Sequence, residues 1–577
     1  MKIKLARTAG FCMGVRRAVE MVLDAANTSK GDVYTFGPLI HNPQVLDILK
    51  KKGVTVLDDH SCQRPGIVLI RAHGVPPETK KRLNDAGHRV IDATCPRVIR
   101  VQTIIQKYAR SGYNTLIVGD PDHPETIGLL GYAEGRGHVI RTFDELTKLP
   151  TFEKAIVVAQ TTQDTWLFHE ISKEIASLWP HYKIFNTICD STMKRQAEVE
   201  EMARMVDAMV VVGGRNSGNT KRLVQVAEHT GVRAYHVETE SDLDTKDLEK
   251  MNSVGITAGA STPNWVIRKV YRTLESLPFQ KKGGWRNSIF KIQRCLILSN
   301  IYVALGAGCL SFTCALLQGI RPSITLALTA TFYVLSMHIL NKFTVGEAIQ
   351  YNDPDKAVFY ERNKTLLLSL ALSSGVAGLV IALSFGLIPF LILFTMSILG
   401  VLYNVKLTPG RVRIRGSFQR IKDIPGSKTV LIATAWGIVT AFLPGIIALG
   451  KITLSLMFVS LWAIIMVFVR TALFDILDIQ GDRIVGQETL PIVFGEDKTM
   501  SILKVLLLVF LVALPLAYPL NIATTLSYPL IPCTLYMGGT LLIYEQGWMI
   551  PGLQFEFLVE TSFVFAGLIS LGWWFLL

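Results

Sequence analysis

The sequence predicts an α/β domain followed by an all-α membrane domain of about nine transmembrane helices. Through residues 1–275, short runs of Val, Ile and Leu bounded by turn residues alternate with amphipathic helical patterns, as expected for parallel α/β units. After about residue 295 the chain becomes a series of long apolar segments separated by short charged loops. With 577 residues it is too long for one ordinary hydrophobic core. We therefore expect domains of two different physical kinds.

The α/β half places a cysteine at three similar positions. Its predicted strands lie in GIVLIRAHG, YNTLIVGD, KAIVVAQTT, AMVVVGGRN and SVGITAGAST. Cys12, Cys95 and Cys189 each lie at a switch from strand to helix. Parallel α/β folds bind ligands beyond the carboxyl ends of their strands, so an internal threefold arrangement would bring the three sulfurs together. The alternative is three unrelated buried cysteines.

A second set of polar residues follows the predicted strands, where a hydrophobic core would not need them. Each lies beside Gly or Pro, and histidines, hydroxyls and backbone N–H groups on one face suit a phosphate or diphosphate. The set comprises His41, His73, His123, Glu125, Thr161, Ser217, Asn219 and Ser261. Taken singly, each signal is weak; His41 alone would be interpreted as an ordinary loop histidine.

Nine motifs follow one another through this half: GFCMGVRRA, IHNPQV, AHGVP, DATCPRV, DHPETIG, QTT, NTIC, NSGNTKRL and TAGASTP. In this order they resemble the 4-hydroxy-3-methylbut-2-enyl diphosphate reductase (LytB) family of the non-mevalonate isoprenoid pathway. The resemblance implies a three-lobed, pseudo-threefold iron–sulfur domain over residues 1–280. A 4Fe-4S cluster would be held by Cys12, Cys95 and Cys189. Three thiolates leave one iron with an open position, to which a substrate hydroxyl can bind.

The same resemblance implies roles for the polar residues. The substrate diphosphate would be held by His41, His73, Ser217, Asn219 and Ser261. Glu125 would supply a proton through Thr161, and His123 and Thr161 would orient the substrate hydroxyl. Gly218 stands where many relatives carry a second serine, and its backbone N–H can still bind phosphate. The products would be isopentenyl and dimethylallyl diphosphate, with electrons from a small carrier such as ferredoxin or flavodoxin.

Charge and cysteine usage exclude other classes. The net charge is +13, but many cations flank membrane segments, in QKKGGWRNSIFKIQR and KLTPGRVRIRGSFQRIK, where they indicate topology and lipid contact rather than nucleic-acid binding. The eight cysteines are scattered and follow no secretion signal, so we expect no disulfide framework. The N-terminal MKIKLARTAGFCMGV lacks the apolar core of a signal peptide. We expect the first half to stay in the cytosol.

Beyond a basic linker at residues 281–294, nine apolar segments approach the roughly 20 residues that a bilayer requires. They are 295–318, 322–340, 365–385, 387–404, 428–449, 452–474, 500–519, 523–543 and 557–577. The linker and the loops after segments two, four and six are long and charged, so we expect them on the cytoplasmic side of a bacterial inner membrane. The reductase-like half would lie on that side, and the C-terminus across the membrane.

Three aspartates follow the sixth segment, in FDILDIQGDRIVGQETLP. Asp475, Asp478 and Asp482 have the spacing i, i+3, i+7, so one helical face can present all three. Carboxylates at a membrane boundary are costly unless they bind something, and three together suit Mg²⁺ carrying a diphosphate. The alternative is a solvated acidic cap at the end of a helix.

Nine spans with this motif after the sixth resemble the UbiA superfamily of intramembrane prenyltransferases. The resemblance implies a Mg²⁺-bound prenyl diphosphate and an unidentified acceptor within residues 295–577. The middle loop is similar too, through Tyr403, Asn404, Lys406 and Lys428 in LYNVKLTP and IKDIPGSKTV. The first motif of the family, N-D-x-x-D, is altered here to LNKFTVGEAIQYNDPD. Asn341 is present, but an aspartate is missing at Thr344, Val345 and Gly346, so that Glu347, or Asp353 and Asp355, would have to substitute.

The sequence thus predicts a bifunctional protein of isoprenoid metabolism, a diphosphate reductase fused to a membrane prenyltransferase. Because the first activity makes the product class that feeds the donor of the second, direct channelling is a hypothesis. Two alternatives stay open. The membrane half could be an inactive anchor, which the altered NKFTVGE favours and the intact DILDIQGD opposes. The cluster could also be a redox sensor, but a sensor has no need of a proton donor such as Glu125.

Overall fold

The computed structural model of the protein describes residues 1–29, 31–57, 64–277, 285–345, 351–403, 424, 426–485, 487–546 and 552–576. The chain divides into two compact units, Met1–Pro278 and Phe279–Leu577. Of the predicted linker, residues 281–284 lie outside the described residues, and helix α12 (Trp285–Leu298) begins directly after them. Each unit has an architecture of its own.

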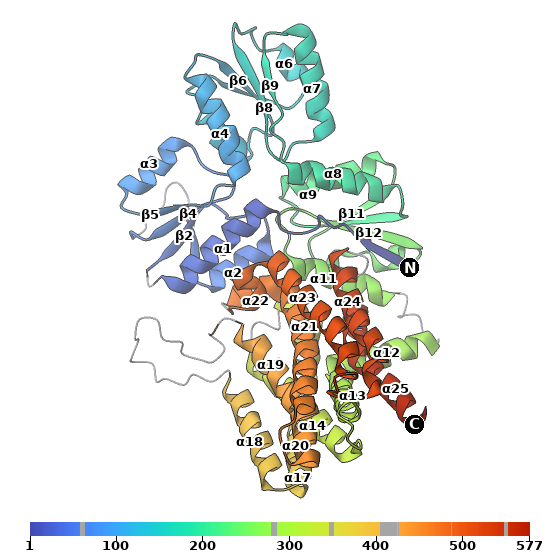
Figure 1. The fold of residues 1–577 in the computed structure, drawn as a ribbon. Coiled ribbons are helices and arrows are strands. Elements are labelled where there is room, and N and C mark those ends of the chain that lie inside the picture. The colour runs from blue at the N-terminus through green and yellow to red at the C-terminus, as the bar shows by residue number, and fades with distance from the viewer. Residues whose placement is uncertain are drawn as a thin grey trace. The chain divides into compact units, whose positions relative to one another are not determined.

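Within its described residues, the first unit contains three four-stranded parallel sheets, one in each of three lobes (Figure 1). The first lobe has strands β1 (Lys2–Leu5), β10 (Ala208–Val212), β11 (Arg233–Val237) and β12 (Ser253–Ala258). The second lobe has β2 (Val33–Phe36), β3 (Val54–Leu57), β4 (Ile67–Ile70) and β5 (Arg89–Asp92). The third lobe has β6 (Asn114–Val118), β7 (Gly137–Ile140), β8 (Ala155–Ala159) and β9 (Lys183–Phe185).

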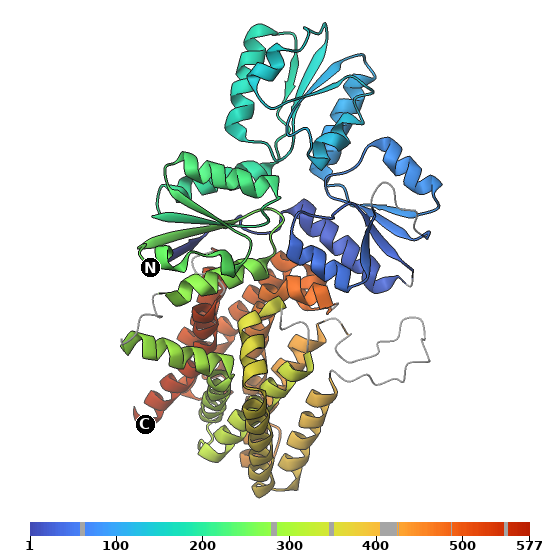
Figure 2. The same ribbon diagram turned by 180° about the vertical axis from the view of Figure 1, so that it is seen from behind.

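The three sheets repeat one topology. Their strand orders are β1-β12-β10-β11, β5-β4-β2-β3 and β9-β8-β6-β7, and all neighbouring strands are parallel. Parallel strands end at the same edge of their sheet, so corresponding strands send corresponding loops to corresponding places. Figure 2 shows the three lobes around a common centre. The predicted three-lobed, pseudo-threefold α/β fold is confirmed.

Helices cover both faces of these sheets, because strands such as AIVVA of β8 and AMVVV of β10 are buried along their whole length. The helices of this unit are α1 (Met13–Thr28), α2 (Pro43–Lys51), α3 (Pro77–Asp85), α4 (Pro96–Ala109), α5 (Pro124–Leu130), α6 (Phe143–Thr147), α7 (Thr165–Leu178), α8 (Asp190–Ala203), α9 (Gly218–His229), α10 (Thr245–Leu248) and α11 (Asn264–Ser276). Proline opens α2, α3, α4 and α5, at a position where its missing N–H costs no helical hydrogen bond.

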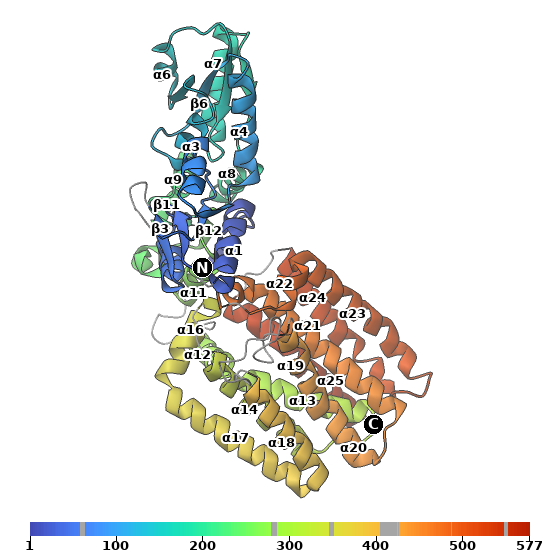
Figure 3. The same cartoon turned by 90° about the vertical axis from the view of Figure 1, so that its left-hand side faces the viewer.

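The second unit is helical throughout its described residues, and its long helices lie side by side (Figure 3). After α12 come α13 (Ile301–Leu317), α14 (Ile324–Val345), α16 (Pro354–Arg362), α17 (Lys364–Ser384), α18 (Leu387–Leu402) and α19 (Ser427–Gly437). A π-helical turn (Ile438–Phe442) joins α19 to α20 (Leu443–Leu449). The remainder are α21 (Leu454–Val485), α22 (Leu490–Phe494), α23 (Glu496–Ala517), α24 (Ile531–Glu545) and α25 (Leu553–Leu576).

Seven helices among the described residues are long and apolar enough to cross a membrane. They span Ile324–Phe343, Lys364–Ser384, Ser427–Leu449, Leu454–Val485, Glu496–Ala517, Thr525–Glu545 and Leu553–Leu576. The pair α12 and α13 makes an eighth candidate, bent by 74°, where Asn300 adopts the left-handed conformation that asparagine tolerates better than most residues. Helix α18 is apolar but shorter, at 16 residues. Each of the nine predicted segments therefore falls on an apolar helix or on the bent pair.

Helix α21 extends well beyond the predicted sixth segment, which ends at residue 474. It continues to Val485 as one helix of 32 residues. The three predicted metal-binding aspartates accordingly lie on its last turns rather than in a loop after it. A continuous helix fixes the angles between these side chains, which a loop would not do.

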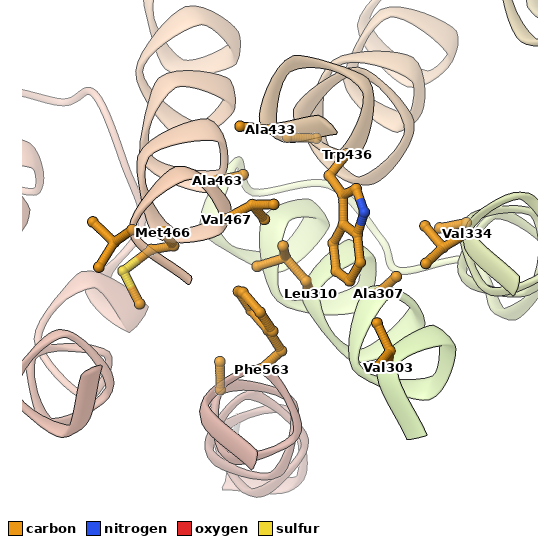
Figure 4. Close-up of a cluster of buried hydrophobic side chains, with 14 of the residues drawn as sticks. Val303, Ala307, Leu310, Val334, Ala433, Trp436, Ala463, Met466, Val467 and Phe563 are labelled. Atoms are coloured by element: carbon orange, nitrogen blue, oxygen red, sulfur yellow. The ribbon is translucent and has the colours of Figure 1, made fainter. Parts of the chain in front are cut away.

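Figure 4 shows the part of the second unit's core where side chains of α13, α14, α19, α21 and α25 meet. Trp436 of α19 and Phe563 of α25 are the largest of the labelled side chains, and their ring centroids lie 5.5 Å apart. Alanines such as Ala307, Ala433 and Ala463 lie around them (Figure 4). Small residues let helix backbones approach closely in a membrane, so that dispersion contacts hold the bundle together.

One ion pair lies inside this apolar core. Arg470 of α21 donates from Nε and a terminal nitrogen to Glu560 Oε1 of α25, and both side chains are less than 10% exposed. The guanidinium carbon also lies 4.9 Å from the ring centroid of Phe474 and 5.9 Å from that of Trp436. Charges at such a depth are retained only when they are paired.

We predict that Arg470→Met destabilises the membrane unit by about 3–5 kcal/mol, because it leaves the buried Glu560 carboxylate without a partner. The double variant Arg470→Met with Glu560→Met should recover most of this loss, since no buried charge then remains. Thermal unfolding of the detergent-solubilised protein measures both. A single variant as stable as the natural protein would show that the pair is hydrated in place.

Candidate active sites

The three predicted cluster cysteines occupy the same structural position in the three lobes. Each follows the edge strand of its sheet and is the N-cap of the next helix, so Cys12 precedes α1, Cys95 precedes α4 and Cys189 precedes α8. Their backbone N–H groups donate to Ala260 O, Ala72 O and Thr161 O, at 3.1, 2.9 and 2.9 Å respectively. These acceptors follow β12, β4 and β8, the strands beside the edge strands. One hydrogen-bonding pattern thus positions all three sulfurs.

The cysteine loops of the first and second lobes come into close contact. A Cβ atom on Gly14 would lie 2.6 Å from Cys95 Sγ, so only glycine fits two residues after Cys12. All three cysteines are free thiols and half-buried. Among the described residues, no three His, Cys, Asp or Glu side chains are close enough to coordinate one metal ion. Free cysteine thiols are the ligand type that holds iron–sulfur clusters in proteins.

Three histidines lie together near these loops. The ring centroids of His41 and His73, from the second lobe, are 5.4 Å apart, and that of His123, from the third lobe, is 6.3 and 5.2 Å from them. Burial lowers the pKa of all three, that of His123 to about 4, and the neighbouring Arg71 acts in the same direction. Neutral imidazoles can each donate one N–H to a ligand oxygen.

Residues of the first lobe complete this cluster of polar side chains. Ser217 is the N-cap of α9, and its hydroxyl lies 3.5 Å from that of Ser261. Gly218 follows on the first turn, where a Cβ atom would lie 3.8 Å from the His123 ring. Two buried nitrogens, Asn219 Nδ2 and His73 Nδ1, have no hydrogen-bond partner among the described residues. Unpaired donors beside a helix N-terminus form a site for an anion with several oxygens.

Glu125 lies on the first turn of α5 and is 1% exposed. Its two carboxyl oxygens accept hydrogen bonds from the Thr161 backbone N–H at 2.6 Å and from the Thr161 hydroxyl at 2.8 Å. Burial raises the pKa of Glu125 to about 7, and the two bonds from Thr161 lower it only in part. The carboxyl group can therefore hold a proton near neutral pH. The Thr161 carbonyl also accepts from Cys189 N, which ties this acid to the cysteine loop.

In the membrane unit, two of the three predicted aspartates share one lysine. Lys428 Nζ lies 2.7 Å from Asp475 Oδ1 and 3.9 Å from Asp482 Oδ2. Thr429 Oγ1 donates to Asp475 Oδ2 at 2.5 Å, and Asn352 Nδ2 donates to Asp482 Oδ1 at 2.8 Å. Both carboxylates are fully buried, and within the described part of the chain Asp482 Oδ2 accepts no hydrogen bond. The solvated acidic cap considered from the sequence does not fit this burial.

The other predicted residues of the membrane site lie nearby on the chain but take different roles. Asn341 is near the end of α14, and Asp478 is half-buried on α21. Asp353 is the N-cap of α16 and accepts from Lys356 N at 3.1 Å, so its carboxylate is used by that helix. Tyr403 Oη lies 3.3 Å from Ser427 Oγ. Three predicted positions, Glu347, Asn404 and Lys406, lie outside the described residues.

A further polar contact lies one helical turn from Asn341. His338 Nε2 accepts a hydrogen bond from Trp436 Nε1 at 3.3 Å, which links α14 to α19. Trp436 in turn stands two turns after Thr429 on α19. The two helices that carry the polar residues therefore converge on this histidine and tryptophan.

The sequence model of the LytB protein family matches residues 3–275, and that of the UbiA prenyltransferase family matches residues 362–547. The 4-hydroxy-3-methylbut-2-enyl diphosphate reductase of Geobacter sulfurreducens is 44% identical over 286 residues, which are 49% of this chain and 100% of that protein. The chain belongs to this reductase family. Its C-terminal half carries a UbiA prenyltransferase domain, so both predicted resemblances are confirmed.

Two solved structures are similar to one half each. The E-1-hydroxy-2-methyl-but-2-enyl-4-diphosphate reductase of Plasmodium falciparum is 28% identical, covers 51% of this chain and 98% of its own, and has a TM-score of 0.47. A UbiA homologue from Aeropyrum pernix K1 is 13% identical, covers 48% of this chain and 97% of its own, and has a TM-score of 0.35.

Sequence reasoning missed three residues at these sites. In the reductase half it missed Arg195, which is 3% exposed and donates to Ala258 O and Gly10 O. In the UbiA half it missed Thr429 and Asn352. A Cβ on Gly481 would lie 1.7 Å from Asn352 Oδ1, so the Gly of QGD is the sequence signal for a close neighbour at Asp482. Arg195 carried no such signal, because its contacts come from distant segments.

Because the pKa of Glu125 is about 7, its carboxyl group should be protonated at pH 6 and ionised at pH 8. Infrared difference spectra of the reductase half should show a protonated-carboxyl band that disappears with a midpoint near pH 7. The band should be absent from Glu125→Gln and unchanged in Asp122→Asn, which alters an exposed carboxyl group in the same loop. A band retained in Glu125→Gln would belong to another acid.

Proposed function

We propose that the first unit reduces 4-hydroxy-3-methylbut-2-enyl diphosphate to isopentenyl and dimethylallyl diphosphate, using a 4Fe-4S cluster bound by Cys12, Cys95 and Cys189. One observation carries this proposal. The strand ends that place Cys12 and Cys189 within electrostatic range of Cys95 also hold a buried, protonatable carboxyl group and two buried nitrogens without a partner among the described residues. Removal of an allylic hydroxyl group from a diphosphate needs these parts together: an electron source, an acid and an anion site.

The diphosphate fits the cluster of polar side chains beside the cysteine loops. His73 Nδ1 and Asn219 Nδ2 gain the hydrogen-bond partners that they lack in the free protein. Ser217, Ser261 and the N-terminus of α9 add hydroxyl and backbone N–H donors. His41 supplies a further ring N–H. The negative charge of the ligand also stabilises protonated imidazole, so diphosphate binding raises the pKa values of the histidines.

The cluster, when bound, supplies electrons one at a time and an iron with a free position for the hydroxyl oxygen. The residues around it supply the proton. Glu125 holds a proton near neutral pH and shares its oxygens with the Thr161 hydroxyl. Thr161 therefore relays the proton to the substrate hydroxyl, while His123, beside Gly218, orients that hydroxyl group. Loss of the hydroxyl as water leaves an allylic fragment that two electrons and a second proton convert to either product.

The electrons come from a one-electron carrier of the ferredoxin or flavodoxin type, and the reductase half lies on the cytoplasmic side of a bacterial inner membrane. Two features support these assignments. The cysteines are half-buried, close enough to the surface for electron transfer from a protein partner, and free thiols in this number suit a reducing compartment. The charged loops of the UbiA half favour the same side.

We predict that Glu125→Gln lowers the turnover of substrate at least about 100-fold, because a positioned general acid contributes this much or more, while KM changes little. The assay is anaerobic, with the full-length protein in detergent, its cluster reconstituted, and dithionite as reductant. Asp122→Asn serves as the matched control and should keep full turnover. A cluster-loaded protein that neither binds nor converts the substrate would refute the reductase and favour the redox sensor.

The membrane half, we propose further, is a Mg²⁺-dependent prenyltransferase, with Asp475, Asp478 and Asp482 holding the metal and its prenyl diphosphate. The supporting observation is the buried Asp482 Oδ2, which accepts no hydrogen bond from any residue that the structure describes although its carboxylate is fully buried. Mg²⁺ uses few carboxylates when phosphate oxygens complete its coordination. Lys428 and Asn352 would then contact the diphosphate side of the site.

A different observation favours the inactive anchor. Lys428 already offsets one of the two negative charges of the buried carboxylates, and Asp353, a candidate replacement in the first motif, is engaged as a helix cap. A structural cluster of this kind needs no metal. Whether prenyl diphosphate binds therefore distinguishes the prenyltransferase from the inactive anchor.

We expect radiolabelled geranylgeranyl diphosphate to bind the detergent-solubilised protein only with Mg²⁺, and Asp482→Asn to weaken this binding at least about tenfold, since a tenfold change corresponds to 1.4 kcal/mol. Asp497→Asn, at an exposed position on α23, is the control and should bind as the natural protein does. Binding that depends on neither Mg²⁺ nor Asp482 would support the anchor.

A further inference from the structure

Arg195 is a buried cation for which the described residues provide no carboxylate partner. It lies on α8, six residues after Cys189, and its side chain is 3% exposed. Its two terminal nitrogens donate to Ala258 O at 3.0 Å and Gly10 O at 2.6 Å, and its Nε has no hydrogen-bond partner. Carbonyl oxygens satisfy donors, but they leave the full positive charge uncompensated.

The nearest acidic side chain is already engaged elsewhere. Glu198, one turn further along α8, accepts from the backbone N–H groups of Arg7 and Thr8 at 2.7 and 2.9 Å and from the Thr8 hydroxyl at 2.6 Å. A buried charge without an opposite charge is strongly unfavourable in a protein interior. Glu198 lies within electrostatic range of Arg195 and offsets part of its charge, but among the described residues it forms no ion pair with the guanidinium, so other groups close by contribute as well.

The sulfurs of Cys12 and Cys189 are such groups, since both lie within electrostatic range of the guanidinium. The two carbonyl contacts of Arg195 lie at the loop of Cys12 and at the end of β12, the strand beside it. Gly10 lies two residues before Cys12. Ala258 lies two residues before Ala260, whose carbonyl accepts the hydrogen bond from Cys12 N. Arg195 thus lies on the helix that follows Cys189 and donates to the loop that precedes Cys12, so its charge is close to both sulfurs.

We propose that Arg195 is the internal counter-charge of the iron–sulfur cluster and raises its reduction potential. The inference rests on the proposed cofactor of the reductase half. Reduction adds one electron from an external donor and makes a cluster with three thiolates one unit more negative. A fixed cation in a medium of low dielectric constant stabilises this reduced form more than the oxidised form. Arg195 is accordingly a positioning residue, since it also fixes the loop of Cys12, and it needs no contact with substrate.

The test is a redox titration of the full-length protein in detergent, with the cluster reconstituted, dithionite as reductant and no substrate present. Electron paramagnetic resonance reports the reduced fraction, and iron content reports loading. Arg195→Gln keeps N–H donors but removes the charge, so its midpoint potential should be more negative than that of the natural protein. Arg195→Lys keeps the charge and should shift much less. Arg233→Gln, an exposed arginine paired with Asp247 at the opposite end of the same lobe's sheet, should not shift.

Each outcome decides the question. An Arg195→Gln variant that loads iron fully and titrates as the natural protein does would overturn the proposal, and so would equal shifts in the Gln and Lys variants, which would assign the effect to hydrogen bonding. Loss of loading in the Gln variant but not in the Lys variant supports it, because Lys keeps the positive charge that Gln removes. Loss of loading in both overturns it. A natural protein that loads the cluster but converts no substrate would refute the reductase and leave this titration valid.

Discussion

Three backbone hydrogen bonds, one in each lobe, hold the reductase half in its working form. Each joins the N–H of a cysteine to a carbonyl in the loop after the neighbouring strand, and those loops also carry His73, Thr161 and Ser261. The sulfurs and the polar side chains are therefore positioned by the same contacts. A change in the pairing of any of the three edge strands would move a cysteine and a polar residue together, which explains why the sheets repeat one strand order so closely.

Much of this half could be predicted from the sequence, because its signals are local. The alternation of apolar runs and helices identified parallel sheets, and Gly or Pro beside each polar residue marked the strand ends. What the sequence could not supply was distance between lobes. The bond from Arg195 to Gly10 joins positions 185 residues apart, and the approach of Gly14 to Cys95 joins two lobes. Such contacts leave only an unremarkable Arg or Gly in the sequence.

The membrane half shows the opposite balance. The apolar segments were predicted well, since length and hydropathy decide them, whereas the polar site was predicted only in part. The aspartates were recognised by their helical spacing, but they were assigned to the loop after the sixth segment and not to the same continuous helix. Asn352 was overlooked in favour of Asp353, because a carboxylate is the more obvious metal ligand. In the structure the Asn352 amide donates to Asp482, whereas the Asp353 carboxylate caps α16. The residue that reaches the site is therefore the amide and not the carboxylate.

The first lobe is assembled from the two ends of the reductase half. Strand β1 (Lys2–Leu5), which leads to Cys12, pairs with β12 (Ser253–Ala258), so the loop of Cys12 takes its place only after the chain has been made as far as residue 260. The lobes of Cys95 and Cys189 are built from consecutive strands and have no such requirement. A cofactor that needs all three thiols can therefore bind only when nearly the whole of the first unit has been synthesised.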